Sequence, residues 1–171
     1  MKKGVNTSDI SVLSRSMEKA NNYKEDGITV KIGDYTNYDS LVKAFEGVDK
    51  LLFVSSSEIE NRAEQHQNVV KAAKATGVKN IVYTSFMRKQ ETDNSAIAFL
   101  MDSHLKTENW IKDSGINYTI LQNATYLDML PIFIGEQVLE TGVIMQPAEN
   151  GKSSSVLRQE LAEAAAAVLT S

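Results

Sequence analysis

Four glycine steps divide this chain of 171 residues at points where a helix is expected to end and a strand to begin. Glycine commonly occupies the position just past a helix C-terminus. Each step also leads into a short apolar run of the kind that forms a buried strand. The steps are Gly27-Ile28, Gly47-Val48, Gly77-Val78 and Gly115-Ile116. Strand and helix alternate in this way at least five times, which predicts an α/β fold on a doubly wound parallel sheet.

The expected elements follow from the spacing of the apolar residues. Strands are expected at residues 9–13, 28–32, 51–54, 80–85 and 118–121, and a short one at 143–145. Helices are expected at residues 17–26, 38–46, 61–76, 96–113, 127–140 and 158–170. A polar loop is expected at residues 86–95. No linker or repeat interrupts this order, so residues 1–171 are expected to form one domain.

The apolar run at residues 51–54 leads directly into Ser55, Ser56 and Ser57. A continuously apolar run is typical of a strand buried on both faces, as in a parallel sheet. Its polar end should then open at the carboxyl edge of the sheet, where open α/β folds bind their ligands. The serine hydroxyls and backbone N–H groups would suit a sugar, a phosphate or an amide. An ordinary Ser-rich turn is the alternative.

Composition excludes several classes of function. A net charge of -4 without a long basic run argues against nucleic-acid binding. The chain has no cysteine and two histidines, so thiolate catalysis is excluded and no metal site is expected. No apolar run reaches the roughly 20 residues that span a bilayer, and residues 1–6 do not resemble a signal peptide. We therefore expect no membrane partner and a cytoplasmic protein.

Polar residues follow the first two strands. Arg15, with Lys19 four residues on, stands where dinucleotide-binding sheets contact the adenine ribose. An arginine there accommodates a 2′-phosphate and favours NADP over NAD, although a solvated pair is the alternative. Asp34 and Tyr35 could flank an adenine, but an aspartate in such a turn more often caps the next helix, which we favour.

Later positions offer further candidates. His104 and Glu108 share one face of the long helix, either as satisfied core groups or as a site facing a pocket. Asn123 and Tyr126 could line a substrate pocket, although a buried asparagine more often ties down a loop. His66 lies on a polar helix face and is expected to be solvated.

Taken together, several strings resemble the NmrA-like group of atypical short-chain dehydrogenases. Within this group, the strings are similar to those of NADPH-dependent quinone oxidoreductases and triphenylmethane reductase. The strings are Val12-Leu13-Ser14-Arg15-Ser16, Gly33-Asp34-Tyr35, residues 50–58, residues 68–78, Tyr83-Thr84-Ser85, residues 104–108, residues 113–119 and residues 161–169.

The resemblance implies roles for individual residues. Arg15 and Lys19 would hold the 2′-phosphate of NADPH, and Asp34 and Tyr35 would lie at the adenine. Ser55, Ser56 and Ser57 would line the ribose and nicotinamide, with Tyr83, Thr84 and Ser85 near the nicotinamide. Asn123 and Tyr126 would face a quinone-like acceptor. No catalytic residue is assigned, and His104 and Tyr126 are the candidates.

The chain departs from the family pattern in three places. Leu100 and His104 stand where ordinary short-chain dehydrogenases carry Tyr-x-x-x-Lys, so alcohol dehydrogenation by that mechanism is not expected. The N-terminal strand with its glycine-rich phosphate loop has no counterpart, and neither has a C-terminal substrate lobe. We therefore expect an incomplete Rossmann-like sheet.

The missing strand would lie between the first and third expected strands, so both would keep an unpaired edge. The chain would then close the gap, pair with a second copy as a homodimer, or be marginally stable. The expected function is hydride transfer from NADPH to a quinone-like acceptor. The alternatives are a non-catalytic NAD(P)-binding redox sensor and an inactive fragment.

Overall fold

The computed structural model describes residues 4–88, 97–135, 137–144 and 151–171. Its strands are β1 (Ser11–Ser14), β2 (Thr29–Ile32), β3 (Lys50–Phe53), β4 (Asn80–Phe86), β5 (Asn117–Asn123), β6 (Thr125–Tyr126) and β7 (Ser155–Val156). Its α-helices are α1 (Asn21–Glu25), α2 (Tyr38–Phe45), α3 (Arg62–Ala75), α4 (Ala98–Ser114), α5 (Leu130–Ile134), α6 (Val138–Thr141) and α7 (Arg158–Leu169). Short 3₁₀ turns are η1 (Thr7–Asp9), η2 (Glu18–Ala20) and η3 (Leu127–Met129).

All strand pairs in the described chain are parallel. β3, β4 and β5 form one sheet in that order, in a register that aligns Phe53 with Tyr83 and Tyr83 with Ile120. β1 pairs with β2 in a second sheet, and β6 pairs with β7 in a third. The parallel arrangement is the one that the alternation of strands and helices predicted.

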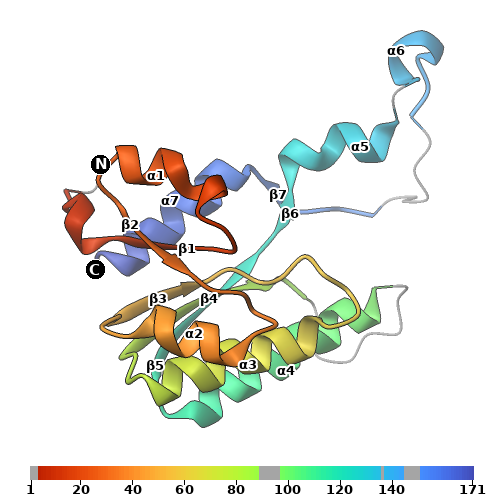
Figure 1. Ribbon diagram of the computed structural model, residues 1–171. Helices are drawn as coiled ribbons and strands as arrows, with labels where there is room; N and C mark the ends of the chain where they lie inside the picture. The colour runs from red at the N-terminus through yellow and green to blue at the C-terminus, as the bar shows by residue number, and fades with distance from the viewer. Residues whose placement is uncertain (1–3, 89–96, 136, 145–150) are drawn as a thin grey trace.

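Helices cover both faces of the β3–β4–β5 sheet. In Figure 1, α2, α3 and α4 lie on one side of it and α7 lies on the other, where α7 contacts all three strands. The Lys50 ammonium at the start of β3 donates hydrogen bonds to the carbonyls of Leu169 and Ser171 at the end of α7, at 2.9 and 3.1 Å. The doubly wound prediction is therefore confirmed, with a Rossmann-like arrangement of strands and helices.

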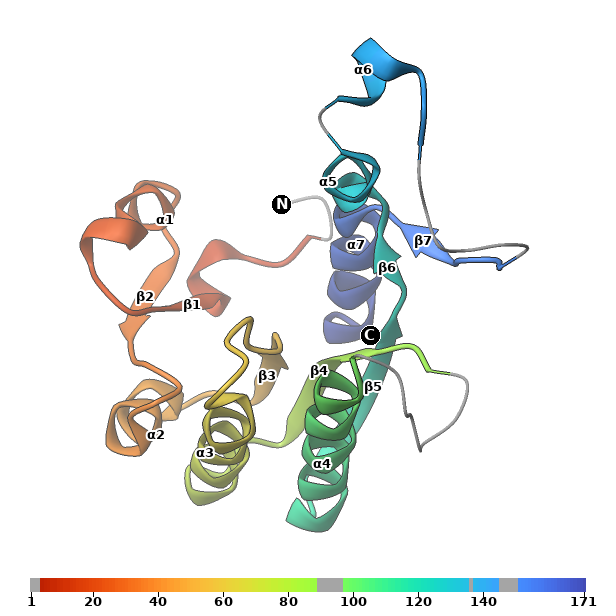
Figure 2. The same ribbon diagram turned by 90° about the vertical axis from the view of Figure 1, so that its right-hand side faces the viewer.

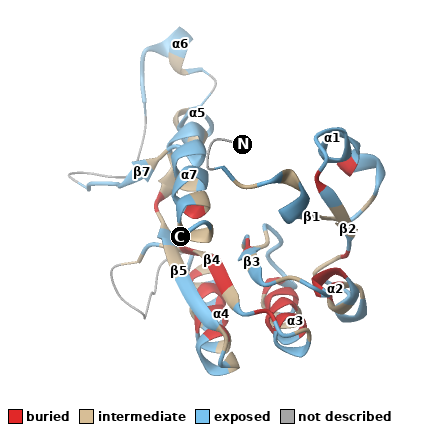
Figure 3. Cartoon of the chain, turned by 90° about the vertical axis from the view of Figure 1, so that its left-hand side faces the viewer, coloured by how far each residue is buried: buried red, intermediate tan, exposed pale blue. Residues whose placement is uncertain are grey.

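The core lies between this sheet and the layer of α2, α3 and α4. Figure 3 shows most of the buried residues on these elements. Fully buried side chains there include Leu41, Phe53, Val69, Ile81 and Ile111. The two long helices end where the glycine steps predicted, because Gly77 and Gly115 take φ angles of 75° and 80°, a left-handed conformation that glycine adopts without steric cost.

The sheet is divided between β1 and β3. No strand of the described chain pairs with either facing edge, and Figure 2 shows β1 and β2 apart from β3. Of the three outcomes expected for the missing strand, closure of the gap by pairing of β1 with β3 is not seen in the described chain. Leu13 of β1 nevertheless packs against the core. A methyl group at Gly33, just after β2, would lie 2.9 Å from Leu13 Cδ1 and 3.2 Å from the Ser40 carbonyl oxygen.

Several expected elements differ from the structure, mainly after residue 123. The single helix expected at 127–140 is wrong: η3 and α5 are followed by Gly135, whose φ of 85° ends the helix, and α6 begins at Val138. Val143 and Ile144 form no strand, and residue 145 lies outside the described residues. The two-residue strands β6 and β7 were not expected. Most of the loop expected at 86–95 also lies outside the described residues.

None of the helices described combines the length and the apolar character that a membrane crossing needs.

Candidate functional site

The carboxyl ends of β3, β4 and β5 meet at one edge of their sheet. Ser55, Ser56 and Ser57 follow β3, Ser85 lies near the end of β4, and Asn123 ends β5. The parallel register places Ser85 beside Gln122 and Phe86 beside Asn123. The sequence-predicted residues on these three strands are therefore brought together by the topology, at the edge where open α/β folds bind ligands.

The serine loop is held in place by hydrogen bonds to side chains of β4 and α3. The Ser55 N–H donates to Thr84 Oγ1 at 2.9 Å, and the Ser56 N–H donates to His66 Nε2 at 2.9 Å. Ser56 Oγ donates to Gln65 Oε1 at 2.6 Å. Two of the N–H groups expected to be open to a ligand are therefore already used. The Ser55 and Ser57 hydroxyls make no hydrogen bond to the described residues and remain available.

His66 is fully buried, so the expectation that it is solvated is wrong. Because Nε2 accepts from the Ser56 N–H, the ring proton lies on Nδ1, which donates to Thr107 Oγ1 at 2.7 Å. Thr107 in turn donates to the Ser103 carbonyl at 2.7 Å. Burial, with the nearby Arg62 charge and His104, lowers the pKa of His66 to about 3, so its imidazole is neutral.

His104 belongs to the same buried network. The Arg62 guanidinium lies with Nη2 2.9 Å from His104 Nε2, and guanidinium groups only donate. His104 Nε2 therefore accepts, and Nδ1 donates to the Tyr83 hydroxyl oxygen at 2.8 Å. Burial and the Arg62 charge lower the pKa of His104 to about 4. Burial raises the pKa of the Tyr83 phenol, so both groups keep their protonation state near neutral pH.

Glu108 faces Arg88 and Ser85 and makes no hydrogen bond to His104. Arg88 donates to both Glu108 carboxylate oxygens at 2.7 Å, and Ser85 Oγ donates to Oε1 at 2.5 Å. Burial by itself would raise the pKa of Glu108, but these hydrogen bonds and the Arg88 charge outweigh it and lower the pKa. Arg88 was not singled out from the sequence, because it stands in a stretch read only as a polar loop.

Arg15, Asp34 and Tyr35 gather at the carboxyl edge of the β1–β2 sheet. The register pairs Ser14 with Ile32, so Arg15 and Asp34 follow neighbouring strand ends. Asp34 Oδ1 accepts from the Thr36 N–H and hydroxyl at 2.9 and 2.8 Å. Those bonds, and to a smaller extent the Arg15 charge, lower the pKa of Asp34. Arg15 itself is exposed, and so is Lys19 on η2.

Asp34 caps a turn, whereas the α2 N-cap is Asn37, whose side chain accepts from the Ser40 N–H. The favoured expectation that Asp34 caps that helix is therefore wrong. Tyr35 joins the two sheets, since its hydroxyl donates to the Val54 carbonyl at 3.2 Å and its ring meets Phe53 edge-on. Burial raises the pKa of Tyr35 to about 12.

Asn123, at the end of β5 opposite Phe86, and Tyr126, in β6, are both half-buried. The Asn123 carbonyl accepts from the Met87 N–H at 3.0 Å. The Arg158 guanidinium lies 5.8 Å from the Tyr126 ring centroid. The Tyr126 hydroxyl makes no hydrogen bond to the described residues.

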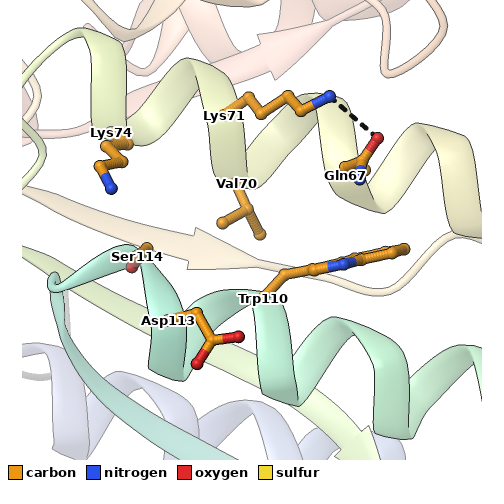
Figure 4. Close-up of a pocket in the computed structure, with 7 residues that line it drawn as sticks. All are labelled: Gln67, Val70, Lys71, Lys74, Trp110, Asp113 and Ser114. Atoms are coloured by element: carbon orange, nitrogen blue, oxygen red, sulfur yellow. Dashed lines mark hydrogen bonds between the residues drawn. The ribbon is translucent and has the colours of Figure 1, made fainter.

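A shallow groove of about 170 Å³ lies elsewhere, between α3 and α4. Figure 4 shows the Trp110 ring between the two helices, with Lys71 and Lys74 on α3 and Asp113 on α4. Lys74 and Ser114 are at the C-terminal ends of their helices, which lie at the amino edge of the sheet. The groove is therefore not part of the candidate site. No cluster of three or more His, Asp or Glu side chains that could hold a metal occurs among the described residues.

Comparison with known proteins identifies relatives of this fold. A family model described as NAD(P)H-binding matches residues 2–171. Quinone oxidoreductase 2 of Escherichia coli (strain K12) is 42% identical over 168 residues, which are 98% of this chain and 57% of that protein. An NmrA-like family domain-containing oxidoreductase of Aspergillus flavus is 31% identical over 91% of this chain and 51% of its own length.

A solved structure is similarly close. The structure of Citrobacter sp. triphenylmethane reductase complexed with NADP(H) superposes with a TM-score of 0.88 at 43% identity. It covers 99% of this chain, and this chain covers 59% of it. The chain thus spans somewhat more than half the length of the relatives that it matches.

Proposed function

The chain belongs to the NAD(P)H-binding family, within its NmrA-like oxidoreductases, and we propose that it binds NADPH across the carboxyl edges of its two main sheets. In this proposal the bound dinucleotide delivers hydride to a quinone-like acceptor. The observation that carries the cofactor choice is the position of Arg15. It is the first residue after β1, exposed and within electrostatic reach of Asp34 at the neighbouring strand end.

The charge at this position favours NADP over NAD. A carboxylate at such a strand end accepts from the ribose 2′-hydroxyl, whereas an arginine accommodates a 2′-phosphate. Asp34 is the only nearby acid at these strand ends, and Thr36 already donates two hydrogen bonds to it. Arg15 and Lys19 would therefore hold the 2′-phosphate, with Tyr35 beside the adenine.

The other edge fits the ribose and nicotinamide. Its serine loop is fixed by Thr84 and His66, and the Ser55 and Ser57 hydroxyls remain available to a sugar or an amide. A loop whose shape is set before the ligand arrives loses little conformational freedom on binding. Within the described residues we find no glycine-rich phosphate loop, so the fit concerns the two ends of the cofactor.

The buried network suits an acceptor that needs no protein acid. His104 and His66 hold their protons in hydrogen bonds to Tyr83 and Thr107, and burial keeps both rings neutral and the Tyr83 phenol protonated near neutral pH. The cofactor supplies hydride when bound, and the protein binds and orients the acceptor through Asn123 and Tyr126. A quinone fits these conditions because its reduced oxygen can take a proton from water after release.

The same network supports a second candidate, NADP binding without turnover in a redox sensor. Its histidines and Tyr83 do not exchange protons readily near pH 7. A purely binding role does not require proton exchange. The two candidates differ only in turnover with an acceptor, so one set of measurements separates them.

Calorimetric titration of the 171-residue chain with NADPH and NADH tests the cofactor choice. We expect Arg15→Ala to weaken NADPH binding by about tenfold, the loss of one charge-assisted contact, and to leave NADH binding nearly unchanged. Lys24→Ala, an exposed cation on α1, is the matched control. An equal effect of Arg15→Ala on both nucleotides would reject the 2′-phosphate contact.

Addition of a soluble benzoquinone then separates the candidates. NADPH oxidation dependent on the quinone supports the oxidoreductase, whereas NADPH binding without oxidation supports the sensor. Absence of binding by either nucleotide would reject both.

A further inference from the structure

Arg62 carries a buried positive charge that no carboxylate opposes. It is the first residue of α3 and only 7% exposed. One terminal nitrogen donates to His104 Nε2 at 2.9 Å, and Nε has no hydrogen-bond partner. No Asp or Glu of the described residues lies within ion-pair distance of it; the four ion pairs there use other cations, namely Lys79, Arg88, Lys106 and Arg158.

The surrounding groups do not compensate this charge. Arg88 and Glu108 oppose each other in a bidentate pair. Both histidines of the network are neutral, as their hydrogen bonds require, and the Tyr83 phenol keeps its proton. The cluster therefore carries one net positive charge. Burial of an uncompensated ion costs several kcal/mol, so buried charges in proteins are normally paired.

The position of Arg62 indicates what the charge is for. It lies five residues after Ser57, at the N-terminus of a helix of 14 residues, where the helix dipole adds further positive potential, and through His104 it is linked to Tyr83 at the nicotinamide side. Its charge also interacts with the Tyr126 phenol, one of the two residues expected to face the acceptor. The unopposed guanidinium thus lies among the residues that we assign to the nicotinamide and the acceptor.

We propose that Arg62 is the anion-binding residue of the site and holds the oxygen of a carbonyl-type acceptor that becomes negative on reduction. This inference rests on the proposed function. The acceptor gains one hydrogen and two electrons from the C–H bond that breaks at the nicotinamide, which is thereby oxidised. An electron pair of the conjugated acceptor moves onto a carbonyl oxygen and forms an aryloxide, which takes its proton from water to become the hydroquinone.

The proposal fits the fixed protonation of His66, His104 and Tyr83. An arginine stays charged at all relevant pH values, so it stabilises an oxyanion without losing or gaining a proton. His104 accepts from Arg62 and holds the guanidinium in place, which makes it a positioning residue. Arg62 was not singled out from the sequence, because an arginine at the start of a polar helix ordinarily faces solvent.

Binding of a stable aryloxide tests the proposal without turnover. The probe is 2,6-dichloro-4-nitrophenolate, an anion at neutral pH, and its neutral methyl ether is the control ligand. We expect the 171-residue chain to bind the phenolate at least about tenfold more tightly than the ether, since a charge-assisted hydrogen bond is lost in the ether. Equal affinity for the two ligands would overturn the proposal.

Variants then locate the charge. Arg62→Gln should weaken binding of the phenolate by about tenfold and leave binding of the ether unchanged. Arg62→Lys keeps the charge and should retain most of the affinity for the phenolate. Lys79→Gln removes an exposed cation remote from the carboxyl edge of the sheet and should change the affinity for neither ligand. Unchanged phenolate affinity in Arg62→Gln would contradict the assignment. If that variant does not fold, loss of the phenolate preference in a folded Arg62→Lys contradicts it instead.

Two further readouts separate this proposal from its premise. If the anion is a phosphate of the cofactor, Arg62→Gln weakens NADPH and not the phenolate, which overturns the acceptor assignment. If NADPH fails to bind at all, the proposed function fails while the phenolate titration still decides the role of Arg62. Removal of an unopposed buried charge should also not lower the melting temperature, whereas a clear loss would show that Arg62 is structural.

Discussion

The layer of β3, β4, β5, α3 and α4 and the segment after it, residues 124–157, differ in how they treat apolar and charged side chains. In the layer, Ile111 is fully buried and the Arg88–Glu108 pair is 10% and 3% exposed. In the segment, Ala124 is the only buried residue among those described, and Leu139 is 94% exposed. Its Asp128 pairs with Arg158 of α7, and these side chains are 30% and 61% exposed.

The difference shows where the stability of this chain resides. Burial of apolar surface and satisfied polar groups in the layer supply the favourable free energy, whereas an exposed segment contributes little. Matched substitutions in the two regions test this difference in stability.

Loss of the buried ion pair should have the largest effect. Glu108→Gln removes the carboxylate opposite the Arg88 charge, and we expect it to lower the free energy of unfolding by about 4 kcal/mol. Urea denaturation with linear extrapolation measures the change. Asp128→Asn, in the more exposed pair with Arg158, is the control and should change the midpoint much less. Similar effects of the two substitutions would remove the contrast between the regions.

Acid should weaken the layer through its two histidines. Both are neutral when folded, with pKa values of about 3 for His66 and about 4 for His104, against about 6.5 in the unfolded chain. The unfolded state therefore binds more protons, and the stability present above pH 6.5 is lost as the pH falls. Between pH 7 and pH 5 the loss should be about 2 kcal/mol for each histidine.

Urea titrations at the two pH values measure this dependence. His104→Gln removes one of the titrating groups, so the stability of that variant should depend on pH about half as steeply. A wild-type chain equally stable at pH 7 and pH 5 would mean that the rings are not held neutral by burial.

Truncation of the core should cost somewhat less than the ion pair. Ile111→Ala leaves a cavity under α4 and should lower the free energy of unfolding by about 3 kcal/mol. Leu139→Ala on α6 removes an exposed side chain and should change it by less than about 0.5 kcal/mol. A Leu139 effect as large as that of Ile111 would show that residues 124–157 are packed in solution.

The smallest effect is expected where the β1–β2 sheet meets α2. Gly33→Ala places a methyl group against Leu13 and the Ser40 carbonyl, and such overpacking should cost about 1–2 kcal/mol. Thermal denaturation measures the shift in melting temperature. In a Leu13→Ala background the same substitution should cost less, and an unchanged cost would show that the backbone, not Leu13, limits the space.

The alternation of strands and helices could be predicted because it depends on local signals, namely the spacing of apolar residues and the glycines at helix ends. Gly77 and Gly115 mark helix ends by a backbone conformation that other residues adopt at a cost. The region after residue 123 could not be predicted in this way. Its two-residue strands β6 and β7 pair across 30 positions of sequence, and α5 ends at Gly135, which the apolar pattern does not mark as a helix end.

The sequence predicted where the residues of the candidate site lie in the sheet, but not which side chains they contact. Parallel topology alone brings the serine loop, Ser85 and Asn123 to one edge. Burial of His66 and Arg62 could not be foreseen, because each lies on a helix face that is polar in sequence and is buried against α4. The tertiary neighbour of a polar residue, here Thr107 or His104, decides whether it is solvated.

The single tryptophan, Trp110, is an intrinsic fluorophore at one defined place in the fold. It lies on α4 next to α3, half-buried against the core. Its fluorescence will therefore follow disruption of one layer, while circular dichroism sums over all helices. If the two signals change at different urea concentrations, the parts of this molecule melt in separate steps and a two-state treatment does not apply.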